Sequence, residues 1–88
     1  MDYYVNKVKK DINDNIIELY IKGLGVLSLK ETIELIQKGN TLFTLYSEHG
    51  KEIKGAKVLI DRGFGKAYLT THPNHNDKDN LDNLPSIW

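Results

Sequence analysis

The segment YLTTHPNHNDKDNLDNLP, which ends three residues before the C-terminus, gathers polar side chains that could bind a metal ion. His72 and His75 have H-x-x-H spacing, and Asp77 and Asp79 follow closely. Imidazole and carboxylate groups are ligands of zinc and similar ions. The segment is predicted to be an irregular loop, however, and it lacks the glycine and final glutamate of a calcium loop. The pattern therefore favours a solvated polar loop, and we expect no metal and no cofactor.

The loop DRGFGK places two cations around an aromatic side chain. Arg62 and Lys66 flank Phe64, and Tyr68 follows on the next predicted strand. Cations bind phosphate and aromatic rings stack on bases, so these four residues are candidate ligand contacts. The alternative is that Phe64 packs onto the core or onto a second copy of the chain.

No catalytic motif is recognised. The sequences GLG and GFG fall short of a phosphate-binding loop or a dinucleotide fingerprint. The chain has no cysteine nucleophile, and no serine lies in a recognisable elbow. Tyr68, His72 and Asp79 can be drawn as an acid–base set, but no geometric argument supports it. We therefore expect a protein that is not an enzyme.

The sequence DNLDNLP near the C-terminus predicts a one-turn helical latch. Asp79 suits an N-cap, and Leu81 and Leu84 are three residues apart and can face the core together. Pro85 disfavours helical backbone at the preceding residue and ends the turn. The alternative is that Asp79 and Asn80 bind the base or ribose edge of a ligand.

The elements that must position these residues form a single α+β domain over residues 1–88. Strands are predicted over residues 3–10, 16–22, 41–47, 55–61 and 67–71, a helix over 29–38, and a polar tail with a short turn over 72–88. The order β-β-α-β-β-β with short loops predicts a small antiparallel sheet with the helix packed on one face. In the second strand, the two-residue period places Ile17, Leu19 and Ile21 on one face.

The helix carries the clearest local signal, SLKETIELIQKGN. Ser28 is a good N-cap, and Glu31 stands at the capping-box position. Leu29, Ile33 and Ile36 form the core of an apolar stripe at helical spacing. The helix should therefore cover one face of the sheet.

Composition limits the classes of partner. The chain has 88 residues, 40% of them apolar, and its twelve basic residues balance twelve acidic ones. A core this small often needs self-association, so we expect a homo-oligomer. Zero net charge gives no global reason to bind nucleic acid or a membrane surface. Because the first residues hold no apolar run, we expect no signal peptide and a cytoplasmic protein.

The chain resembles a bacterial and phage family catalogued as domain of unknown function 3892. The resemblance covers nearly the whole chain and is most specific at Tyr68, Leu69, Thr71, Asp79, Asn80, Leu81, Leu84 and Pro85. Relatives often have Arg where this chain has Thr70, and an Asp-Gly turn where it has Asn74 and His75. The histidines are thus not family features, and a ligand contact made by that Arg would be missing here. The resemblance implies a fold but no activity.

Three functions remain open. The first is a non-enzymatic binding module that recognises a small polar ligand or a protein partner. The second is a phage- or bacterium-encoded protein of the anti-defence type that sequesters a nucleotide-like signal. The third is a weak nucleic-acid binder, which the zero net charge disfavours. The candidate ligand-binding residues are Arg62, Phe64, Lys66, Tyr68, Asp79 and Asn80, and their convergence in one pocket would favour a ligand.

Overall fold

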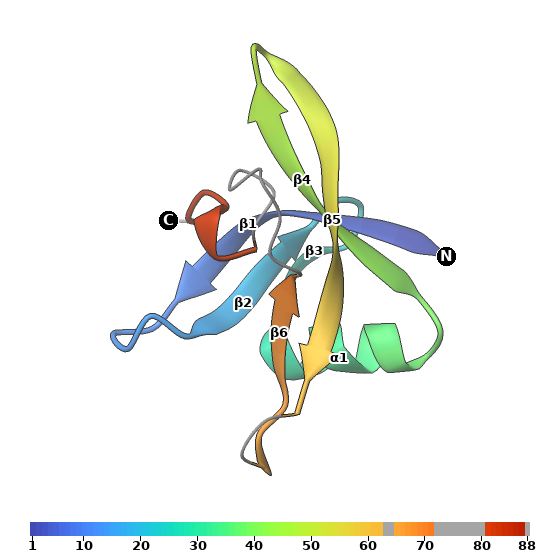
Figure 1. Cartoon of the computed structure of the whole chain (residues 1–88), viewed down its shortest axis with the longest axis vertical. Helices are drawn as coiled ribbons and strands as arrows, with labels where there is room; N and C mark the ends of the chain where they lie inside the picture. Colours follow the sequence, from blue (N-terminus) through green and yellow to red (C-terminus); the bar gives the residue numbers. More distant parts are fainter. Residues whose placement is uncertain (63–64, 72–80, 88) are drawn as a thin grey trace.

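The structure, a computed structural model, describes residues 1–62, 65–71 and 81–87. The elements are β1 (Asp2–Lys10), β2 (Ile16–Ile21), β3 (Gly25–Ser28), α1 (Leu29–Gln37), β4 (Thr41–Glu48), β5 (Lys51–Asp61), β6 (Tyr68–Thr71) and the 3-10 turn η3 (Leu81–Asn83). The six strands form one sheet in the order β3-β2-β1-β4-β5-β6. Helix α1 contacts both β3 and β6, the two ends of that order, so the sheet curls around the helix (Figure 1).

The sheet is mixed, which corrects the expected antiparallel sheet. Strands β1 and β4 pair in parallel, from Asp2 opposite Thr41 to Val5 opposite Thr44. Parallel neighbours need a long crossover connection. Here β2, β3 and α1 together supply it, because they carry the chain back to the end of the sheet where β1 begins. The antiparallel prediction was based on the short loops between strands, and these give no indication of this one long connection.

Strand β3 was missed, so the order of elements is β-β-β-α-β-β-β rather than the predicted one. The sequence GLGVL lies between the predicted second strand and the predicted helix, but its end pairs with β2, placing Val26 opposite Tyr20. Gly23 and Gly25 both have φ of +88°, and the N–H of Leu24 donates to the carbonyl of Ile21 at 2.9 Å. The two glycines thus allow a tight turn that returns the chain along β2.

Strand β5 also begins earlier than predicted, at Lys51 instead of residue 55. Its first residues are mostly charged and give no strand signal of their own. They pair with β4, with Lys51 opposite Glu48, after a turn in which His49 and Gly50 have positive φ. The strand therefore forms because a partner is available, not because of local preference.

Helix α1 begins at the predicted capping box. The Ser28 hydroxyl accepts from the N–H of Glu31 at 3.1 Å, and the Glu31 carboxylate accepts from the N–H of Ser28 at 3.0 Å. The helix ends at Gln37, with Lys38 as its C-cap. Its fully buried residue is Thr32, whose hydroxyl donates to the Ser28 carbonyl at 2.8 Å, while Ile33 is half-buried.

The capping box predicts a pH dependence of stability. Hydrogen bonds from Ser28, first its backbone N–H and then its hydroxyl, hold the pKa of Glu31 below its ordinary 4.5. A lowered pKa stabilises the fold above the unfolded-state pKa, and this contribution is lost as the pH falls through the folded-state value. We expect Glu31→Gln to lower the melting temperature near neutral pH, with the difference from wild type shrinking as the pH falls below the ordinary glutamate pKa of 4.5. Thermal melts of both proteins across this pH range measure the difference in melting temperature. A difference that does not change with pH would contradict the prediction.

The core lies inside the curl of the sheet. Its buried apolar residues are Val5, Val8, Leu19, Ile21, Leu42, Val58, Leu69, Leu81 and Leu84. Ile17 was expected beside Leu19 and Ile21 but is 38% exposed. The pairing of β1 with β2 shifts there, since Lys9 lies opposite Glu18 while Lys10 lies opposite Ile16. This bulge places Ile17 outside the regular alternation, so the predicted face was wrong for that residue.

The C-terminal segment closes the fold. Leu81 is 1% and Leu84 is 6% exposed, which agrees with the prediction that both side chains face the core. The segment also extends the sheet, because the N–H of Val8 donates to the Pro85 carbonyl and the N–H of Ile87 donates to the Val8 carbonyl, each at 3.0 Å (Figure 1). The turn is 3-10 rather than α-helical. Its predicted N-cap, Asp79, lies outside the described residues.

Candidate functional site

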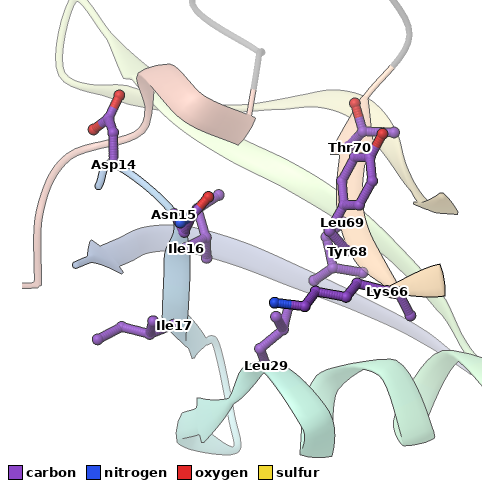
Figure 2. Close-up of a pocket in the computed structure, with 10 residues that line it drawn as sticks. Asp14, Asn15, Ile16, Ile17, Leu29, Lys66, Tyr68, Leu69 and Thr70 are labelled. Atoms are coloured by element: carbon purple, nitrogen blue, oxygen red, sulfur yellow. The ribbon is translucent and has the colours of Figure 1, made fainter. Parts of the chain in front are cut away.

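An open groove of about 570 Å³ lies between the start of β2 and strand β6 (Figure 2). Its lining residues are Asp14, Asn15, Ile16, Ile17, Leu29, Lys66, Ala67, Tyr68, Leu69 and Thr70. This volume is within the range of small-molecule sites in proteins. We call it the seam groove, because it lies where the curled sheet fails to close.

The strand lengths explain why the seam stays open. Strand β3 pairs with β2 only from Glu18 onward, so no described strand lies beside Ile16 and Ile17 on that side. Strand β6 is the last strand of the sheet and pairs only with β5 in the part of the chain that the structure describes. Helix α1 starts at Leu29, which lines the bottom of the gap in the close-up view (Figure 2).

The groove has an apolar floor and polar walls. Leu69 is 7% exposed, and Ile16 and Leu29 are half-buried, so these side chains offer a surface for an apolar group. Lys66 extends across the groove toward the side of Leu29 (Figure 2). Its ammonium makes no ion pair with any described residue. On the opposite wall the Asp14 carboxylate lies 3.6 Å from the Lys10 ammonium.

Tyr68 is held in place by its neighbour on β5. Asp61 lies opposite Tyr68 in the pairing of β5 with β6. A hydrogen bond to the Asp61 carboxylate raises the pKa of Tyr68 above its ordinary 10.0, with smaller contributions from desolvation and the negative charge. The phenol therefore stays protonated near neutral pH and donates to Asp61. Its ring is 45% exposed and lines the groove as a stacking surface.

The structure brings together two of the predicted ligand-binding residues, Lys66 and Tyr68. Arg62 is exposed at the end of β5 and does not line the groove. Phe64, Asp79 and Asn80 lie outside the described residues, so the predicted convergence of all these side chains is not tested. The histidine and aspartate residues considered as metal ligands also lie outside them, namely His72, His75, Asp77 and Asp79. Within the ranges that are described, no group of three or more candidate metal ligands occurs.

The sequence analysis missed the wall opposite β6. In the turn DINDN, the Asp11 carboxylate accepts from the N–H groups of Asn13 and Asn15 at 2.9 and 3.0 Å. Asp14 has φ of +66°, which the turn requires. The cluster of Asp and Asn residues signals a turn. Nothing in the sequence shows that this turn lies across a groove from a strand more than fifty residues later.

The fold and groove define a small α+β domain with one helix, a mixed sheet and a ligand-sized opening at its seam. The chain belongs to the family described as "Protein of unknown function (DUF3892)", which matches residues 4–85. Searches of the curated proteins and of the solved structures each gave no match. Among the described residues, no helix has the length and apolar character needed to cross a bilayer.

Proposed function

We propose that this protein is a non-enzymatic binding module that takes a small polar ligand or a segment of a protein partner into the seam groove. The observation that carries the proposal is the groove itself, where the Lys66 ammonium, which makes no ion pair with a described residue, and the Tyr68 ring lie beside an apolar floor. A cation, a stacking surface and apolar contacts together suit a ligand with an anionic group next to a flat or apolar part.

Binding is favoured over catalysis by the state of the groups in the groove. The Tyr68 phenol is committed to Asp61, and its raised pKa makes it a poor base or nucleophile near neutral pH. The Asp14 carboxylate pairs with Lys10 across 3.6 Å. Neither group is arranged as the activated nucleophile or the general base that a reaction would need.

A second candidate is a phage- or bacterium-encoded cytoplasmic protein that sequesters a nucleotide-like signal. It is favoured by Lys66 and Tyr68 lining the same groove, since an ammonium binds phosphate and a ring stacks on a base. Weak binding of nucleic acid is disfavoured by the zero net charge. In either role a homo-oligomer would enlarge the small core of the chain.

Native mass spectrometry of the protein purified from its own host tests the proposal. We expect the wild-type chain to retain an extra mass that disappears on denaturation. Lys66→Glu should lose that mass because it reverses the charge in the groove, while Lys57→Glu should keep it. Lys57 is the matched control, since it is exposed on β5 and does not line the groove. Identical masses before and after denaturation, together with no bound partner chain, would argue against the proposal.

A further inference from the structure

The groove runs along the free backbone edge of β6. Three consecutive residues of β6, from Tyr68 to Thr70, line it, together with Lys66 and Ala67, which precede the strand. Side chains of a strand alternate between its two faces, so one face contributes only every second residue. Consecutive residues can all line one groove only when the edge of the strand faces it. Strand β6 is also the end of the sheet, so this edge carries backbone groups without a strand partner among the described residues.

The opposite wall consists of a turn and the start of a strand. Four consecutive residues, from Asp14 to Ile17, line it, and the pairing of β3 with β2 begins only at Glu18. The groove is therefore bounded by the strand backbone of β6 on one side, and by the turn before β2 and the first two residues of β2 on the other. At about 3.3 Å per residue, the three residues of β6 that line the groove span about 10 Å, which is enough to pair with a short strand.

From this arrangement we infer that the occupant of the seam groove is an extended segment of a partner protein, which adds to β6 as a further strand and places an acidic side chain at Lys66. Unpaired N–H and C=O groups on a strand edge are satisfied by another strand, and such edges are a common mode of peptide recognition. This inference rests on the proposed function and specifies its ligand class.

The walls and the floor set the chemistry of the segment. Its side chains alternate, so every second one faces the apolar floor made by Leu69, Ile16 and Leu29. The Lys66 ammonium has no acidic partner among the described residues, so an Asp or Glu of the segment forms an ion pair with it. The segment should therefore read as apolar and polar residues in alternation with at least one acid.

The edge of β3 lies at the other end of the sheet and is a weaker candidate for the addition of a partner strand. Its residues Gly25–Ser28 include no charged group that would select a partner. Neither the seam groove nor the smaller groove lined by Val8 and Leu84 holds consecutive residues of β3. The seam groove combines a free edge, an apolar floor and a charge, and the edge of β3 offers only the first.

A random library of ten-residue peptides, selected against the full 88-residue chain, tests the inference. Enriched peptides are synthesised in two backbone-methylated forms, each with alternate amides methylated. A strand directs alternate N–H groups to the same side, so one form loses the hydrogen bonds to β6 and the other keeps them. We expect the first form to bind at least about tenfold more weakly and the second to bind within about twofold of the parent.

The role of the Lys66 charge is tested with the same peptides. Lys66→Glu should weaken their binding by about tenfold or more, while the control Lys57→Glu should leave it unchanged. The inference is overturned if no peptide is enriched, if both methylated forms bind alike, or if Lys66→Glu has no effect. Sedimentation that shows a wild-type dimer and a Lys66→Glu monomer would make a second copy of the chain the occupant instead. A small molecule retained in native mass spectrometry without peptide enrichment would overturn this inference and leave the proposed function standing.

Discussion

Deleting residues 72–88 will leave a chain that is largely unfolded at room temperature. The deletion removes Leu81 and Leu84, which are buried in the core. Each is worth about 1.5–3 kcal/mol on full burial. It also removes both hydrogen bonds that the segment makes with Val8 in β1. The total stability expected for a domain of this size is about 4–13 kcal/mol, so the loss is a large part of it.

Circular dichroism melts of the full and the truncated chains measure the effect. A second variant, Leu81→Ala with Leu84→Ala in the full chain, separates the loss of the two side chains from the loss of the backbone pairing. Ile12→Ala is the matched control, because Ile12 is 100% exposed and the same kind of truncation there should leave the melt unchanged. A truncated chain with an unchanged melt would mean that the segment is a ligand-gripping tail and not part of the fold.

Leu19→Ala will destabilise the protein by about 2–5 kcal/mol, and Ile17→Ala by less than about 1 kcal/mol. The two residues lie on the same strand, and the two-residue period of a regular strand predicts that they share a face. Leu19 is 0% exposed and Ile17 is 38% exposed because of the bulge between them and β1. Removal of the Leu19 side chain therefore leaves a cavity in the core, while removal of the Ile17 side chain mostly changes the surface.

Urea unfolding of the two variants provides the comparison. For Leu19→Ala we expect unfolding at a lower urea concentration, with the same dependence of the free energy of unfolding on urea. This result would mean a loss of stability without a change in the unfolded state. Equal losses for both variants would mean that β2 is regular and that Ile17 is in the core. In that case the wall of the seam groove at Ile17 would be placed wrongly as well.

The sequence by itself determined the elements whose signals are local. The capping box predicts α1 because Ser28 and Glu31 satisfy backbone groups within four residues of each other. Alternation in β2 predicts the burial of Leu19 and Ile21. The three-residue spacing of Leu81 and Leu84 predicts their common direction. In each case the residues that form the structure are close in the chain, so a short stretch contains the whole cause.

Only the tertiary structure decided which strands meet. The parallel pairing of β1 with β4 depends on a crossover through three elements, and β3 and the charged start of β5 become strands because a partner strand lies beside them. The bulge at Ile17 likewise arises from how β2 meets β1. The seam groove joins the Asp14–Ile17 wall to β6, which follows about fifty residues later. Local preference cannot specify such pairings, because their energy comes from backbone and side-chain contacts that exist only once the chain has folded.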